Sequence, residues 1–107
     1  MKQYLRFIDR VQKINAGLEL THFEIKMLDF AALLHLSDQS IFVGDLINQT
    51  HIASQATLHK TVKNLVNKKL LVAKISKEDG RQKHVLLTRL ALGRYKKLDQ
   101  AVSRATV

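Results

Sequence analysis

Small, polar and basic side chains lie at helical spacing in residues 54–69, and their types could bind nucleic acid. Leu58, Val62 and Leu65 recur every three or four residues, which predicts a helix with one face docked on a core. At about 100° per residue, the opposite face presents side chains that can reach base edges and phosphates. For contacts to bases we expect Gln55, Ala56, Thr57, His59 and Lys60, and for contacts near the DNA backbone the helix-capping Ser54, Lys63 and Asn64.

The chain after this helix changes to the period of a β-strand. Residues 71–76 and 84–88 predict two short strands, joined by the polar residues 77–83, which contain Asp79-Gly80. A capped helix followed by a hairpin with a basic tip predicts the recognition helix and wing of a winged helix-turn-helix. The alternative for the helix is an ordinary solvated face, and the alternative for the hairpin tip is a simple turn.

Basic side chains at the hairpin tip could contact a second part of a duplex. An arginine on a narrow hairpin can enter a minor groove and respond to its width, and we expect Arg81 to do so. Lys77 and Lys83 would lie over phosphates.

Residues 54–88 contain a series of motifs, namely Ser54, Thr57-Leu58, Val62, Leu65, Lys68-Lys69, Asp79-Gly80-Arg81 and Val85-Leu86-Leu87-Thr88. In these motifs the chain resembles the MarR family of transcriptional regulators. The resemblance implies a winged helix-turn-helix fold, mainly α with a small β-wing, whose terminal helices form a dimer interface. It also implies that Asp79 stabilises the wing and positions Arg81. Two departures are Leu70, where the family usually has glycine, and residues 88–93, where it usually reads Thr-x-x-Gly.

The positive charge is concentrated in the same half of the chain. The net charge is +9, yet residues 1–53 hold five basic and six acidic residues, whereas residues 54–107 hold thirteen basic and three acidic ones. A polyanion such as nucleic acid is the partner that this distribution favours. The alternative is a small lysine-rich protein whose charge only keeps it soluble.

The remaining helices are expected to build the core and a partner surface. Thr21 and Glu24 form a capping-box pattern before a central buried helix that ends near Leu36. Residues 41–43 predict a short strand that closes the sheet, and residues 44–49 predict the first helix of the helix-turn-helix. Apolar stripes on the first and last helices predict a homodimer, the alternative being that each stripe packs on its own core. The stripes contain Tyr4, Phe7, Val11 and Ile14, and Tyr95, Leu98 and Val102.

Several function classes find no support in the sequence. The 107 residues have room for one domain, 1–107, without cysteines or a run of apolar residues long enough to span a bilayer, so we expect a cytoplasmic location. Five histidines occur, but none forms an i,i+4 pair or a Cys/His cluster, so we expect neither a metal nor a catalytic site. No cofactor motif is present.

The sequence therefore predicts a sequence-specific regulator that binds double-stranded DNA, a dimeric repressor of the MarR type. The alternative is a winged-helix module that binds a protein or RNA, because a fold does not dictate a function. A small-molecule effector would fit the family resemblance, but no pocket can be assigned to it from the sequence.

Overall fold

The computed structural model describes residues 1–75 and 83–105, which contain five helices and one two-stranded antiparallel sheet. The mainly helical fold class with a small hairpin is confirmed. No helix in this described part of the chain is long and apolar enough to cross a membrane. The elements are α1 (Lys2–Gly17), α2 (His22–Leu36), α3 (Val43–Ile47), α4 (Gln55–Asn67), β1 (Leu71–Ile75), β2 (Lys83–Leu87) and α5 (Arg89–Ala105).

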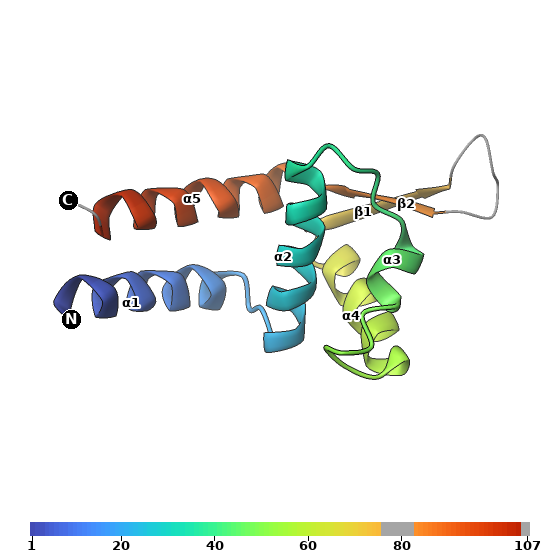
Figure 1. Cartoon of the computed structure of the whole chain (residues 1–107), viewed down its shortest axis with the longest axis horizontal. Coiled ribbons are helices and arrows are strands. Elements are labelled where there is room, and N and C mark those ends of the chain that lie inside the picture. The colour runs from blue at the N-terminus through green and yellow to red at the C-terminus, as the bar shows by residue number, and fades with distance from the viewer. Residues whose placement is uncertain (76–82, 106–107) are drawn as a thin grey trace.

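Two parts of the molecule are visible in Figure 1, and we name them the arm and the lobe. The arm consists of α1 and α5, which pack side by side and carry both chain ends at their far end. The lobe consists of α2, α3, α4 and the hairpin. The molecule measures 50 × 27 × 22 Å, because the arm projects from the lobe along the longest axis.

The helix α2 is the centre of the lobe, and it begins with the expected capping box. The Thr21 hydroxyl accepts a hydrogen bond from the Glu24 amide (3.3 Å), and the Glu24 carboxylate accepts one from the Thr21 amide (3.2 Å). Leu28 is fully buried. Near the end of the helix, however, Leu33 and Leu36 are 63% and 79% exposed, so the expectation of a buried helix holds for only part of its length.

A single apolar cluster fills the lobe. Burying one leucine, isoleucine, valine or methionine side chain stabilises the fold by about 1.5–3 kcal/mol relative to leaving it in water. Residues from α2, α3, α4, both strands and the start of α5 meet there, which fixes the inner face of α4. The buried members are Met27, Leu28, Ala31, Ile41, Leu46, Leu58, Val62, Leu65, Leu70, Leu71, Val85 and Ala91.

The hairpin pairs β1 with β2 in antiparallel register, from Leu71 opposite Leu87 to Ile75 opposite Lys83. The second strand begins and ends one residue earlier than expected. It ends at Leu87 because the next residue, Thr88, caps α5. Its hydroxyl accepts a hydrogen bond from the Ala91 amide (3.2 Å).

The short strand expected at residues 41–43 is a single bridge between Phe42 and His84. The chain turns directly after this bridge, since the Asp45 carboxylate accepts a hydrogen bond from the Phe42 amide (3.0 Å) and α3 already begins at Val43. The first helix of the helix-turn-helix is thus shorter than residues 44–49 predicted, and it starts one residue earlier.

Three helices end in the same way, with a residue other than glycine at positive φ. These residues are Glu19 (55°), Asp38 (56°) and Lys69 (61°), after α1, α2 and α4. At the end of α4, the Lys69 amide donates to the Val66 carbonyl and the Leu70 amide to the Leu65 carbonyl, both at 3.0 Å. This pair of hydrogen bonds defines a Schellman motif, in which the positive-φ residue is usually glycine.

The position that favours glycine is therefore Lys69. The family resemblance had placed this glycine at Leu70. Leu70 is fully buried, as is Leu65, and an apolar pair at these two positions commonly accompanies the motif. A side chain is needed at Leu70, while the backbone at Lys69 is strained.

Replacing Lys69 with glycine should raise the free energy of unfolding by about 0.5–1 kcal/mol, since glycine adopts positive φ without steric cost. Denaturant unfolding at a fixed protein concentration measures this change. Lys63→Gly is the matched control: Lys63 is exposed inside α4, where glycine should lower stability by about 1 kcal/mol. Equal effects at both positions would contradict the strain at Lys69.

Candidate nucleic-acid interface

The helix α4 begins with the expected cap. The Ser54 hydroxyl accepts a hydrogen bond from the Thr57 amide (3.3 Å) and donates one to the Thr57 hydroxyl (3.1 Å). Both side chains are thus used to start the helix. Further along, the Thr61 hydroxyl is buried and donates to the Thr57 carbonyl at 2.7 Å, so this polar group on the inner face has a partner.

The two faces of α4 differ as the sequence predicted. Leu58, Val62 and Leu65 are buried in the lobe. On the other face the structure places Gln55, Ala56, His59, Lys60 and Lys63 in the solvent, whereas Thr57 and Asn64 are partly buried.

The partly buried Asn64 has a partner inside the lobe. Its amide nitrogen donates to the Glu24 carboxylate at 3.4 Å, so this side chain is bound within the chain, whereas the sequence suggested a contact near the DNA backbone. Glu24 itself is only 1% exposed. The sequence pattern predicts only the capping-box role of Glu24, because its contact with α4 joins segments far apart in the chain.

The Glu24 carboxylate anchors the end of α4. The Lys68 ammonium group donates to it at 2.5 Å and to the Glu19 carbonyl at 2.6 Å. Burial by itself raises the pKa of Glu24, but the hydrogen bonds from Lys68, Thr21 and Asn64 lower it more, so the pKa lies below its usual 4.5. The carboxylate is therefore charged at neutral pH and holds α4 against α2.

The base of the wing is described, but its tip is not. Lys83 is exposed at the start of β2, next to the bridge that joins the hairpin to Phe42. Lys77, Asp79 and Arg81 lie outside the described residues.

The arrangement of α3, α4 and the hairpin is that of a winged helix-turn-helix, and the sequence model of the MarR family matches residues 23–82. The chain belongs to the MarR family. Membership in this family confirms the general function expected from the sequence, a DNA-binding transcriptional regulator. A comparison with curated proteins found no match.

Several solved structures have the same fold. A mutant of MepR from S. aureus bound to an oligodeoxyribonucleotide has a TM-score of 0.71 at 18% identity, over 91% of this chain and 68% of that chain. BpsR from Bordetella bronchiseptica has a TM-score of 0.60 at 21% identity, over 98% of this chain and 76% of that chain. AdcR from Streptococcus pyogenes has a TM-score of 0.57 at 22% identity, over 98% and 74%.

The expected dimerisation residues are spread over the arm of this MarR-family protein. Because α1 and α5 pack on each other, part of each stripe is covered within the chain. Tyr95 in particular packs against the core, and its hydroxyl donates to the Asp29 carboxylate at 2.6 Å. Tyr4 and Val102 are 65% and 48% exposed, whereas Phe7, Val11, Ile14 and Leu98 are partly buried.

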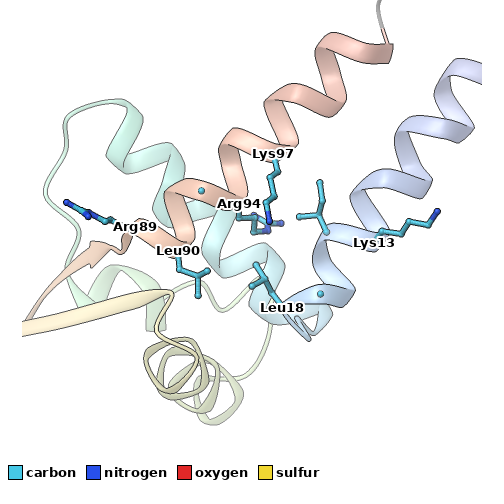
Figure 2. A pocket seen from close by; sticks show the side chains of 9 residues that line it. Lys13, Leu18, Arg89, Leu90, Arg94 and Lys97 are labelled. Carbon is cyan, nitrogen blue, oxygen red and sulfur yellow. The ribbon is translucent and has the colours of Figure 1, made fainter.

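A cleft of about 460 Å³ lies between α1 and α5 where the arm meets the lobe (Figure 2). Leu18 and Leu90 form part of its apolar lining. Lys13, Arg89 and Lys97 add exposed cations, and Arg94 is buried between the helices.

Stability should depend on pH through Glu24. Because the pKa of Glu24 is lower in the folded chain, its stabilisation is present above about pH 4.5 and is lost as the pH falls through the folded value. Glu24→Gln should lower the free energy of unfolding at neutral pH by about 1.5–3 kcal/mol, the range for a hydrogen bond to a charged group. The variant should also lose less stability in acid than the original protein does.

Denaturant unfolding at about pH 7 and about pH 3.5 checks both effects. The control is Asp9→Asn, because Asp9 pairs with Lys13 on the surface (2.9 Å, 59% exposed carboxylate side chain) and should contribute below about 1 kcal/mol. If Glu24→Gln and the unaltered protein lost the same free energy of unfolding between the two pH values, the Glu24 carboxylate would not hold α4.

Proposed function

We propose that this protein is a dimeric, sequence-specific repressor that binds double-stranded DNA through α4 and the wing. The observation that carries the proposal is the exposed outer face of α4, whose inner face is fixed in the core. Gln55 can pair with adenine and Lys60 with guanine, and the Ala56 methyl group can touch thymine. Lys63, one turn further along the helix, would lie nearer to phosphates.

The wing supplies a second contact in this proposal. Lys83 is exposed at the base of the hairpin and would lie over a phosphate. From the sequence pattern we assign Arg81 to the minor groove, Lys77 to a phosphate and Asp79 to the stability of the wing.

An apolar groove supports the dimer. It lies between α2 and α5, has a volume of about 680 Å³, and is lined by Leu33, Leu36, Leu92, Leu98 and Val102, among others. A groove lined by exposed apolar side chains is a surface that a partner could cover, and most soluble oligomers are symmetric homodimers. A two-fold dimer would place two lobes on one face of a palindrome, with α4 helices about 34 Å apart.

Two solved relatives show activities that agree with this proposal. MepR of S. aureus has been crystallised with DNA, and the DNA binding of BpsR is regulated by 6-hydroxynicotinic acid.

Lys60→Ala should weaken binding to a selected operator more than binding to random duplex, lowering the specificity ratio by the ~1–3 kcal/mol of a base contact. Titrations with both duplexes at two salt concentrations measure this ratio and the salt slope, which should grow by about 0.9 for each phosphate contacted. Lys2→Ala is the control, because Lys2 is an exposed lysine at the far end of the arm. Equal losses on both duplexes would assign Lys60 to a phosphate, and a flat salt response would refute DNA binding.

Replacing Leu98 and Val102 together with glutamate should convert a dimer into a monomer, since charges would be buried in the interface. Sedimentation at tens of micromolar measures the mass, and circular dichroism shows whether the helices remain. Leu86→Glu is the control: Leu86 on β2 is 49% exposed, as Val102 is 48%, but it lies outside the arm. An unaltered chain that sediments as a monomer would contradict the dimer.

A further inference from the structure

An arginine is buried where the arm joins the lobe. Arg94 on α5 is only 3% exposed, and in the described part of the chain the other buried polar or charged residues are Glu24 and Thr61. Figure 2 shows Arg94 directed from α5 into the space between the helices, while Lys13 is directed away from it. A buried charge is costly unless it is paired, so the partners of Arg94 decide where it can lie.

The partners of Arg94 come from the two other helices at this junction. Its Nε and Nη2 atoms donate to the Asn15 Oδ1 atom on α1, at 3.1 and 2.9 Å. Its Nη1 atom faces the Asp29 Oδ1 atom on α2 at 3.5 Å. The neighbouring Tyr95 donates to the same Asp29 oxygen, and its ring centroid lies 4.9 Å from the Arg94 guanidinium carbon.

These contacts fix the angle between the helices as well as the distance between them. The guanidinium group is planar with donors in a fixed fork, so α1 and α2 must stay in one relative orientation for both sides to be satisfied. Apolar contacts are non-directional and tolerate small rotations. Among the polar contacts described here, the group around Arg94 joins α1, α2 and α5 at one point.

We propose that Arg94 is a positioning residue that fixes the angle between arm and lobe, and thereby the spacing of DNA half-sites that the dimer prefers. This inference depends on the proposed function, because it requires two lobes held by their arms on one duplex. A rotation of about 10° at the junction would move an element roughly 20 Å away by about 3.5 Å, close to the rise of one base pair. A looser junction should therefore accept several spacings.

The test uses the full chain and an operator selected from a random duplex pool. Affinities are measured for that operator, for versions with one or two base pairs inserted or removed between the half-sites, and for a single half-site. Asn15→Ala removes the α1 acceptor, Arg94→Lys removes the fork, and Asn15→Asp restores an acceptor for Arg94. Lys13→Ala is the control, because Lys13 lines the same cleft without contacting Arg94.

We expect Asn15→Ala and Arg94→Lys to lower the preference for the selected spacing by about tenfold, the effect of losing a hydrogen bond to a charged group. Affinity for the single half-site should stay within about twofold of the original. Asn15→Asp and Lys13→Ala should keep the original spacing preference. A role of Arg94 in stability alone would weaken all duplexes together and leave the preference unchanged.

The outcomes separate this inference from the proposed function. If the unaltered protein prefers one spacing and Asn15→Ala keeps that preference, the positioning role is wrong and the regulator assignment stands. If the unaltered protein binds every spacing equally, both are wrong. A variant that loses its helical circular dichroism also counts against the inference. The inference requires each lobe to fold without the contacts between Arg94 and Asn15.

Discussion

The buried Glu24 carboxylate is the interaction on which the placement of α4 depends. A carboxylate removed from water costs free energy unless its oxygens accept hydrogen bonds. Two of the donors are Asn64, in the second half of α4, and Lys68, the residue directly after α4. If α4 rotated or slid along α2, it would leave a buried charge without partners. The polar contact at one end and the apolar contacts along its inner face thus determine which side chains of α4 point outward.

The parts of the fold that depend on neighbours within one helical turn could be predicted from the sequence. The caps at Thr21 and Ser54 and the two faces of α4 follow from such spacings. The contact between Asn64 and Glu24 could not be predicted, because the two residues are 40 positions apart. The neighbours of each residue in the sequence already explain why it is there, so nothing in the sequence points to a contact between them. The spacing alone therefore predicts Asn64 on the flank of the outer face, near the DNA backbone.

The arm shows the same limit of local patterns. Its apolar stripes are real, but periodicity does not say whether a stripe meets its own chain or a second copy. Tyr95 belongs to the stripe of α5, yet it packs on the core and binds Asp29, and burial together with this acceptor raises the pKa of its hydroxyl. The burial of Arg94, one residue earlier, could not be predicted, because a sequence does not distinguish a buried arginine from a surface one.

The Schellman motifs after α1, α2 and α4 bear on how readily this protein can evolve. Glu19 and Lys69 hold a conformation that costs residues other than glycine about 1–2 kcal/mol each, while the whole domain is expected to be stable by only about 5–15 kcal/mol. Single substitutions to glycine at these helix ends could therefore raise the free energy of unfolding without changing the outer face of α4. A lineage that gained such a substitution could then tolerate destabilising changes on that face. Under the proposed function, such changes would give access to new operator sequences.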